Sequence, residues 1–333
     1  MHRNIFFFIS LLLIASACQT KQPKLTEVAF QGAAQGTYYM VKYYDVEARN
    51  LQSEVDSILK AFDQSLSLWV SGSVISKVNR KEEVMLDEHF VKNLEISNKI
   101  AQETNGAFDY TLGPLIEACG FGFKEKIPLT QDKVDSMKAF VGYSKVDVVH
   151  NRIQFDDPRM EVNFNAVAQG YSVDLIGEFL RSKGIENYLV HIGGEILTSG
   201  YKPGDVEWVV GIQKPTDDAE GAIEAQVRVN LTNKAFVTSG SYRKYYEVDG
   251  KRYSHIIDAQ TGYPVTHQLL SVTVLANTCA EADAYATAFM VMGMDKAKEM
   301  LKDRQDLEAF FIYDENGEFK YEYTEGLGSL IKD

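Results

Sequence analysis

Two tight-turn dipeptides, each between runs of strand-forming residues, constrain the fold more than any other feature of the sequence. Asp249-Gly250 lies between Tyr245–Val248 and Lys251–Ile257. Asn316-Gly317 interrupts the run Tyr313–Tyr323. Glycine tolerates the positive φ angle of a two-residue hairpin turn, so both segments are predicted to be β-hairpins. Because a hairpin joins antiparallel neighbours, at least part of the sheet must be antiparallel.

Further strands and four helices follow from the spacing of apolar residues. Strands are predicted at Val227–Leu231 and Ser271–Leu275, which alternate apolar and polar residues, and at the apolar run Trp208–Ile212. Hairpins interspersed with a few helices predict an α+β fold with antiparallel sheets and packed helices, not a doubly wound parallel sheet. The helices are marked by Leu51, Val55, Ile58, Leu59 and Phe62; by Phe90, Val91, Leu94 and Ala101, ending at Gly106; by Ala166, Val173, Ile176 and Leu180, ending near Gly184; and by the run from Thr278 to Gly293.

The last of these helices has a recognisable start. Thr278-Cys279-Ala280-Glu281 has the pattern of a capping box. In that motif the threonine and glutamate side chains each bind a backbone amide that the helix leaves without a partner. The pattern therefore predicts a well-defined first turn.

The first 18 residues have the layout of a secretory signal. A short basic start precedes an apolar run from Ile5 to Ile14, which is too short to span a bilayer as a helix. Small residues then lead to Cys18, which is expected to be acylated and to become the mature N-terminus. The alternative is a soluble secreted protein with a cysteine at its cleavage site. We predict a lipoprotein signal peptide at 1–18, a tether at 19–28 and one domain at 29–333.

Charge and cysteine content narrow the class of protein. The formal net charge of −13 argues against a nucleic-acid partner and suits a protein that holds a divalent cation. The two other cysteines, Cys119 and Cys279, have neither CxxC nor cysteine–histidine metal spacing. Their small and apolar neighbours favour two buried free thiols, although a disulfide remains possible. The P-loop, the GxGxxG turn, HExxH and GxSxG are all absent from the sequence.

Asp283 and Thr287 form the sharpest local pair. At a spacing of four residues they share one face of the capped helix, so a carboxylate and a hydroxyl converge on one point. Both are hard oxygen donors of the kind that Mg²⁺ accepts. The alternative is an aspartate favoured by the helix dipole and a threonine bonded to its own backbone.

Three other segments are candidates for ligand contacts. The loop Thr104–Asp109 can hold a ligand or simply end a helix. Small residues in Asn163–Gly170 let a backbone approach a phosphate or a metal, or allow tight helix packing. His255 ends a predicted strand, where a histidine can be catalytic or a structural hydrogen-bonding residue.

Taken in order, these segments and several glycine-containing turns form one long pattern. It comprises Gly36–Tyr39, Ser65–Trp69, Ile75–Asn79, Thr104–Gly113, Gly120–Gly122, Asn163–Gly170, Gly193–Glu195, Val210–Gln213, Thr238–Ser241, Ser254–Asp258, Thr261–Val265 and Ala282–Ala288. The pattern resembles the ApbE family, the FAD:protein FMN transferases, from about Gly36 to about Phe310. The resemblance implies an ApbE-like (T-fold-like) architecture.

The resemblance also implies roles for individual residues. Asp283, Thr287 and the backbone carbonyl of Ala166 are similar to the magnesium ligands of the family, and His255 matches the histidine proposed as base. Trp69 matches an aromatic position near the bound flavin, where a ring can stack. The positions implied to contact FAD are Gln35, Trp69, Ala107, Phe108, Asp109, Asn163, Gln169 and Ile257.

The chain departs from the family pattern at several of these positions. Asn163 and Gln169 stand where the family usually has Asp and Lys, so an acid–base pair is replaced by two neutral amides that could bond each other or the ligand. Gln35 stands where the family usually has Met, and Trp69 replaces the commoner Tyr. The missing lysine puts the affinity and the rate in doubt, because its charge would offset that of the phosphates.

The resemblance implies an Mg²⁺-dependent transferase that moves FMN from FAD onto a threonine hydroxyl of an acceptor protein and releases AMP. Typical acceptors of the family are subunits of membrane redox complexes, which suits an enzyme tethered by Cys18 to the extracytoplasmic side of a membrane in the cell envelope. One alternative is an FAD pyrophosphatase that gives FMN and AMP. The other is a non-catalytic FAD-binding lipoprotein, which the amides Asn163 and Gln169 keep open.

Overall fold

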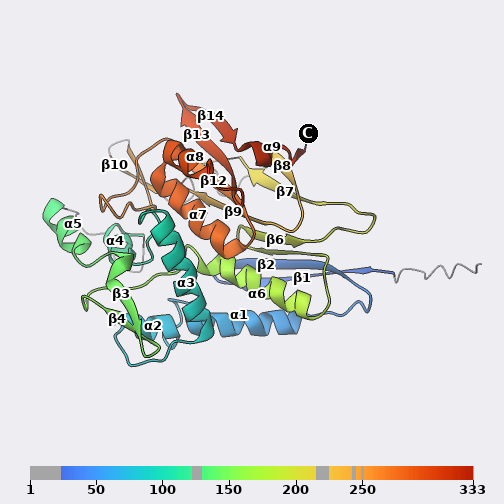
Figure 1. Cartoon of the computed structure of the whole chain (residues 1–333), viewed down its shortest axis with the longest axis horizontal. Coiled ribbons are helices and arrows are strands. Elements are labelled where there is room, and N and C mark those ends of the chain that lie inside the picture. Colours follow the sequence, from blue (N-terminus) through green and yellow to red (C-terminus); the bar gives the residue numbers. More distant parts are fainter. Residues whose placement is uncertain (1–23, 122–129, 215–224, 242–244, 249–250, 333) are drawn as a thin grey trace, which may run out of the picture.

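An eight-stranded antiparallel sheet forms the centre of the protein (Figure 1). The computed structural model describes residues 24–121, 130–214, 225–241, 245–248 and 251–332. The strand order is β1-β2-β5-β6-β9-β12-β13-β14, and every neighbouring pair is antiparallel, as predicted. The strands are β1 (Thr26–Ala34), β2 (Thr37–Asp45), β5 (Tyr188–Ile192), β6 (Glu195–Ser199), β9 (Ala235–Gly240), β12 (Leu269–Ala276), β13 (Glu308–Glu315) and β14 (Glu318–Tyr323).

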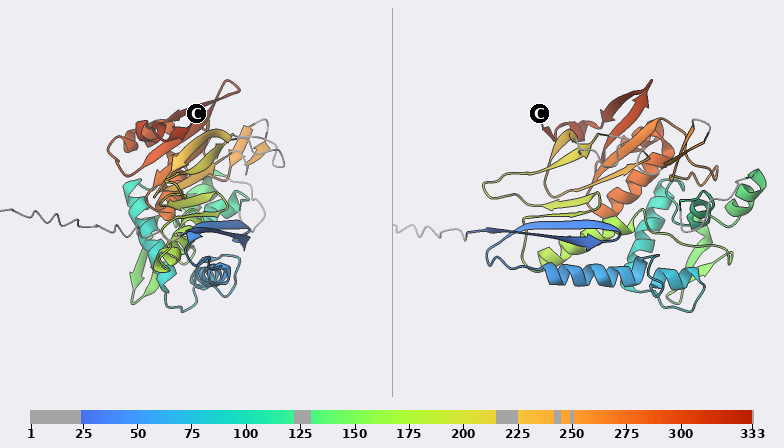
Figure 2. Two further views of the ribbon diagram at one scale, coloured as in Figure 1. Left: turned by 90° about the vertical axis from the view of Figure 1, so that its right-hand side faces the viewer. Right: turned by 180° about the vertical axis from the view of Figure 1, so that it is seen from behind.

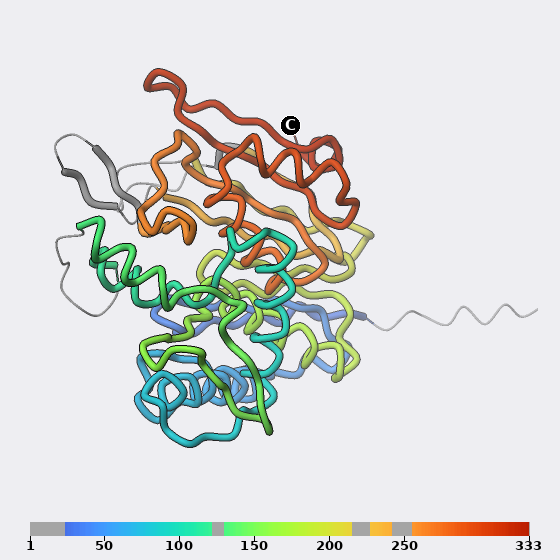
Figure 3. The backbone as a smooth tube through the Cα atoms, turned by 60° about the vertical axis from the view of Figure 1, so that its left-hand side comes forward, coloured from blue at the N-terminus to red at the C-terminus, as the bar shows by residue number. Residues whose placement is uncertain are grey.

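Three smaller sheets and the helices surround this centre. Figure 3 shows the N-terminal helices in blue on one side of the molecule and the C-terminal segments in orange and red on the other. The small sheets are β15-β8-β7 (Ile331–Lys332, Ala225–Leu231, Trp208–Gln213), β10-β11 (Tyr245–Val248, Lys251–Ser254) and β3-β4 (Val146–Val149, Arg152–Phe155). The helices are α1 (Gln52–Leu66), α2 (Val74–Asn79), α3 (Glu88–Glu103), α4 (Gly113–Ala118), α5 (Gln131–Lys138), α6 (Ala168–Ser182), α7 (Cys279–Met292), α8 (Met294–Leu301) and α9 (Glu325–Gly328), with a 3₁₀ turn at Tyr143–Lys145.

Each face of the main sheet carries an apolar core. Successive side chains of a strand point to opposite faces. On β2, Tyr39 and Tyr43 are buried in the larger core, which also contains residues of α1, α6 and α7. Met40 and Tyr44, on the other face, pack with Trp208 of β7 in a second core. The helices α1, α6 and α7 and the sheet β15-β8-β7 therefore cover opposite faces of the main sheet (Figure 2).

The sequence correctly predicts one hairpin turn, and the other lies outside the described residues. Asn316 and Gly317 have φ angles of 57° and 83°, and they join β13 to β14. Residues 249–250 are not described, but β10 and β11 on either side pair as predicted. The strand β11 ends at Ser254, earlier than the predicted Ile257, because Ile257 instead forms an isolated bridge with Pro264.

All four predicted helices are present as α1, α3, α6 and α7. Gly106 follows α3 with a φ angle of 79°, as expected for a helix stop. The helix α6 begins at Ala168, so Ala166 lies just before it and not within it. The reason is local: the Asn165 amide donates to the Asn163 side chain, and Val167 has non-helical backbone angles.

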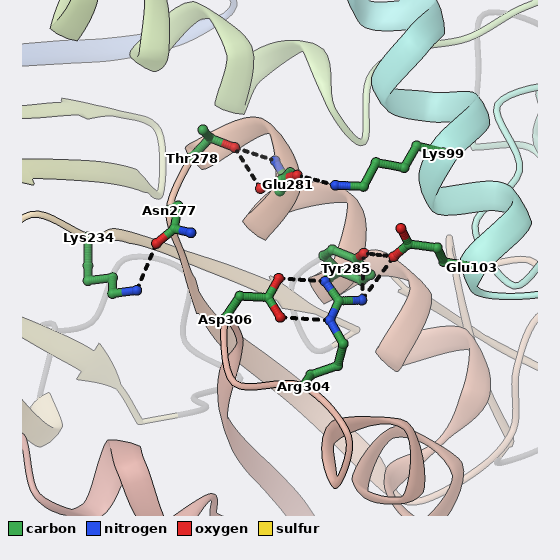
Figure 4. Close-up of polar contacts among 9 residues, drawn as sticks. All are labelled: Lys99, Glu103, Lys234, Asn277, Thr278, Glu281, Tyr285, Arg304 and Asp306. Atoms are coloured by element: carbon green, nitrogen blue, oxygen red, sulfur yellow. Dashed lines mark hydrogen bonds and ion pairs between the residues drawn. The ribbon is translucent and has the colours of Figure 1, made fainter.

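The start of α7 has a partial capping box, which Figure 4 shows, and it also binds a carboxylate from another helix. The Glu281 amide donates to the Thr278 hydroxyl at 3.3 Å. The Glu281 carboxylate accepts from that hydroxyl and from Lys99 of α3, at 3.3 and 2.6 Å. Asp174 of α6 accepts from the amides of Cys279 and Ala280 at 2.8 and 2.9 Å. The sequence did not indicate Asp174, which fixes the first turn of α7 against α6.

An ion-pair network also attaches α7 to its neighbours (Figure 4). Arg304 forms an ion pair with Glu103 of α3 at 2.9 Å and another with Asp306 at 2.7 Å. The Tyr285 hydroxyl of α7 donates to Glu103 and accepts from Arg304. These contacts hold the outer side of α7 in place.

The remaining predictions concern cysteines and the N-terminal segment. Cys119 and Cys279 are buried thiols, as expected. The predicted signal and most of the tether lie outside the described residues. The strand β1 begins at Thr26, so residues 26–28, which were predicted to be part of the tether, belong to the sheet. In the described part of the chain, the helices are all too short or too polar to cross a membrane.

The contact between α6 and α7 depends on Gly170. A Cβ atom at this position would lie 2.3 Å from the Cys279 carbonyl oxygen. We expect Gly170→Ala to lower the free energy of unfolding by about 1–3 kcal/mol, because the two backbones would have to separate. Gly72 is a matched control, since its Cβ would meet no atom within 4 Å. Denaturant unfolding of both variants tests this, and equal stability of Gly170→Ala and the wild-type protein would contradict it.

Candidate active site

A cavity of about 590 Å³ opens at one end of the main sheet. That volume is typical of pockets for small-molecule ligands and cofactors. Its walls come from segments far apart in the sequence, including the start of β2, the turn between β5 and β6, the end of β9, the loop before α4 and one face of α7. Nine of the residues predicted for the site line it: Ala107, Phe108, Asp109, Asn163, Ala166, His255, Ile257, Asp283 and Thr287.

Asp283 and Thr287 line the cavity from the same face of α7, as their spacing predicts. The Asp283 side chain is buried, and its carboxylate accepts a hydrogen bond from the Gly170 amide at 3.3 Å. The Thr287 hydroxyl lies 3.3 Å from the hydroxyl of Ser239 on β9. These two hydrogen bonds therefore join α7 to α6 and β9.

Glu195 brings a second buried carboxyl group to the cavity. Burial raises the pKa of Asp283 well above its ordinary value, and the charge of Glu195 raises it further. Burial also raises the pKa of Glu195 to about 7, although the Gly194 amide donates to it at 2.9 Å. Two buried carboxyl groups beside one cavity favour a bound cation or a bound proton.

The residues around Asp283 fit a magnesium ion. Asp283, Thr287 and Ala166 can supply a carboxylate, a hydroxyl and a carbonyl oxygen, which are donors that Mg²⁺ prefers. Within the described ranges, no group of three or more His, Cys, Asp or Glu residues is arranged to hold a metal. A cation here would therefore complete its shell with water and substrate oxygens, which is usual for Mg²⁺.

Asp109 stabilises the loop that forms one wall of the cavity. Its carboxylate accepts from the Thr111 amide and hydroxyl at 2.8 and 2.6 Å and from the Tyr143 amide at 3.0 Å. These bonds hold the adjacent Ala107 and Phe108 against the cavity. The geometry therefore gives Asp109 a clear structural role, besides its place in the wall.

The two amides that replace the family's charged pair do not bond each other. The Asn163 oxygen accepts from the Asn165 amide at 2.9 Å. Gln169 does not line the cavity, but its Nε2 atom lies against Gly193, where a Cβ atom would approach it to 2.3 Å. Gln169 therefore packs against the glycine turn between β5 and β6 without lining the cavity.

Two further predicted residues lie away from the cavity walls. Gln35 occupies the β1–β2 turn with a φ angle of 52°, and its buried Nε2 atom has no hydrogen-bond partner among the described residues. Trp69 follows α1 and is 70% exposed. The structure thus places neither side chain in the wall of the cavity.

His255 lines the cavity together with Ile257. The imidazole packs edge-on against Phe121, with ring centroids 6.2 Å apart. His255 and Asp283 come from segments nearly thirty residues apart, and the fold brings both to the same cavity.

Several wall residues were not predicted as site residues. They include Tyr38, His191, Glu195 and Ser239. Glu195 and Ser239 stand beside glycines in two of the glycine-containing turns of the sequence, which was the available signal. Tyr38 and His191 reach the cavity through pairing of β2 with β5, and local sequence does not reveal such pairing.

The fold and cavity define an α+β protein with a preformed, acidic ligand site. A model of the ApbE family matches residues 35–311. The FAD:protein FMN transferase of Escherichia coli K12 is 37% identical over 316 residues, which cover 91% of this chain and 89% of the relative. That of Klebsiella pneumoniae is 36% identical over 318 residues, covering 92% and 89%. This chain belongs to the ApbE family.

Solved structures agree with this assignment. The flavin transferase ApbE from Vibrio cholerae superposes with a TM-score of 0.81 at 30% identity, covering 92% of this chain and all of that one. The Pseudomonas stutzeri flavinyl transferase ApbE in its apo form also gives 0.81, at 31% identity, with 92% and 97% covered. The expected ApbE-like α+β architecture is confirmed.

Proposed function

We propose that this protein transfers the FMN part of FAD to a hydroxyl group of an acceptor protein, with AMP as the second product. Membership of the ApbE family supports the reaction class. The observation that carries the proposal is that Asp283 and Thr287 of α7 line the same cavity as His255. An acidic oxygen-donor site beside a histidine suits transfer of a phosphorus group to a hydroxyl.

The residues of α7 would bind the metal. Asp283 and Thr287, with Ala166 from the same cavity wall, would provide the oxygen donors, and Glu195 adds negative charge nearby. Bound Mg²⁺ would neutralise phosphate charge and polarise the bond to be broken. The fixed orientation of α7 matters here, because catalysis of phosphoryl-type transfer consists largely of positioning and electrostatic stabilisation.

His255 would act as the general base. A threonine hydroxyl of the acceptor attacks the FMN phosphorus, the bond to the AMP phosphate breaks, and His255 takes the hydroxyl proton. Its place on the cavity wall, packed against Phe121, gives it a defined orientation. Asn163 and the loop Ala107–Asp109 would contact FAD from the same cavity.

A transfer assay tests the proposal. The protein is incubated with FAD, Mg²⁺ and a threonine-containing acceptor domain, and the acceptor is weighed by mass spectrometry while AMP is quantified. We expect acceptor mass to rise by one FMN residue for each AMP released. Release of FMN and AMP without acceptor modification would indicate a pyrophosphatase, and FAD binding without AMP would indicate a carrier.

We also propose that Cys18 is lipid-modified and tethers the enzyme to the extracytoplasmic face of a membrane. The apolar run followed by small residues and a cysteine supports this. An anchored enzyme would lie close to acceptor proteins that are subunits of membrane redox complexes.

The anchor proposal predicts a change of location. Cys18→Ser is expected to move the protein from the membrane fraction to the soluble fraction, or to leave an uncleaved precursor, because the acylated residue is gone. Fractionation and mass spectrometry of the N-terminus measure both. A wild-type mature protein without lipid would refute the proposal.

A further inference from the structure

Three strands of six or more residues lie at the edges of the described sheets, and only one of them lines the cavity. The strands β1 and β14 are the edges of the main sheet, and β7 is an edge of the small sheet β15-β8-β7. Of the three, only β7 contributes cavity-lining residues, Gly211 and Gln213. A chain that paired with β7 would therefore lead directly to the cavity.

The edge of β7 lacks the charged residues that usually protect an edge strand. Its sequence from Trp208 to Gln213 contains no charge, whereas β14 carries Glu318, Lys320 and Glu322. Charged side chains on an edge discourage pairing with another chain. An uncharged edge strand beside a ligand cavity is thus suited to accept a partner strand.

The strand β7 is also held firmly. Trp208, Val210 and Ile212 point into the second core, and the Trp208 indole donates to the Ser199 carbonyl at 3.0 Å. Val209 and Gly211 alternate with them and are exposed. Among the described residues β7 pairs with β8 alone. A rigid strand costs little entropy when it binds an extended peptide along its outer edge.

We propose that the acceptor protein presents its threonine within an extended segment that pairs with the outer edge of β7. This inference rests on the transferase function proposed above. Backbone hydrogen bonds to β7 would supply affinity with little dependence on sequence, and alternate side chains would point toward the enzyme, as in other cases of strand addition. A threonine in register with Gly211 would then lie beside a residue that lines the cavity.

Hydrogen exchange tests the proposal on the wild-type enzyme. The probe is an acceptor domain that the enzyme flavinylates, with its threonine replaced by valine so that it binds without reacting. We expect the outward-facing amides within Trp208–Ile212, which alternate with those bonded to β8, to exchange about tenfold more slowly in its presence, since they would gain partners. Amides of the two other edge strands, β1 and β14, should be unchanged. Protection confined to another surface, or none on β7, would overturn the inference.

A pair of variants provides a second measurement. Val209→Lys places a charge on the β7 edge without altering a cavity-lining residue, and Phe319→Lys does the same on β14. The two side chains are similarly exposed, at 38% and 43%. We expect Val209→Lys to raise the KM for the acceptor about tenfold with unchanged affinity for FAD, and Phe319→Lys to change neither.

The outcomes separate the two proposals. If the wild-type chain modifies no acceptor, the transferase function itself fails. If it modifies an acceptor while Val209→Lys and Phe319→Lys behave alike and the β7 amides stay unprotected, the function stands and the β7 docking site is wrong.

Discussion

Asp283→Asn is expected to lower the rate of FMN transfer by about 10³ or more at limiting Mg²⁺. A bound metal supplies several kcal/mol of charge stabilisation, and 10³ corresponds to about 4 kcal/mol. Asp283 is the one carboxylate of the predicted donor set, so an amide in its place would bind the cation far more weakly. Thr287→Ala should cost less, because a neutral hydroxyl contributes less to holding a dication. Turnover measured against Mg²⁺ concentration provides the test.

The same substitution is expected to leave the fold intact. Among the described residues, the hydrogen bond to the Asp283 carboxylate comes from the Gly170 amide, at 3.3 Å, and asparagine can still accept it. Asp283 also lies near the buried Glu195, whose charge raises its pKa. Removing one of two neighbouring negative charges should therefore make the metal-free protein no less stable.

Asp174→Asn is a matched control, since Asp174 is also a buried carboxylate. It accepts from two amides at the start of α7, and asparagine has one acceptor oxygen for them. We expect this variant to lose about 1–3 kcal/mol of stability, the cost of a buried unpaired donor, and to keep its dependence on Mg²⁺. If Asp283→Asn kept full activity at limiting Mg²⁺, the metal assignment would be wrong.

Local signals in the sequence predicted much of the fold. Asn316-Gly317 indicated a hairpin because both residues must adopt positive φ angles, and they do. Thr278 and Gly293 marked the ends of α7 because a hydroxyl caps one end and a glycine ends the other. Such features depend on a few neighbouring residues, so one sequence is enough to detect them.

Features that depend on distant pairing could not be predicted in this way. Ser271–Leu275 alternates apolar and polar residues, which suggests a strand with one face exposed to solvent. In the structure, β12 lies between β9 and β13 and is buried on both faces. Its polar side chains pair across the sheet, as Thr273 does with Thr238. The packing of β7 and β8 in the second core likewise depends on contacts between segments far apart in sequence.

The site was predictable to a similar extent. The pair Asp283 and Thr287 followed from helical spacing alone. Glu195 and Asp174 did not stand out, because a single carboxylate gains significance only when the fold buries it beside another. Trp69 was assigned by resemblance, and the structure leaves it exposed beyond the cavity wall. Resemblance identifies a position in the chain, whereas the cavity depends on how the segments pack.

His255→Ala is expected to reduce the rate of FMN transfer by roughly 10² to 10⁴, the usual contribution of a positioned general base. FAD affinity should change little, because the remaining cavity walls, including the loop Ala107–Asp109 and α7, are untouched. The measurements are FAD binding at equilibrium and single-turnover transfer to an acceptor domain. A loss of rate without loss of binding distinguishes a base from a residue that positions the ligand.

His191 is the matched control for this prediction, because it is a second histidine on the same cavity wall. It packs edge-on against Tyr38 at 5.4 Å, and burial lowers its pKa, so its environment disfavours the protonated ring that a base becomes. We expect His191→Ala to retain most of the transfer rate. If His255→Ala were fully active while His191→Ala lost the rate, the base would be His191. If binding and rate fell together in His255→Ala, His255 would position FAD, and the proton would have to leave the acceptor hydroxyl by another route.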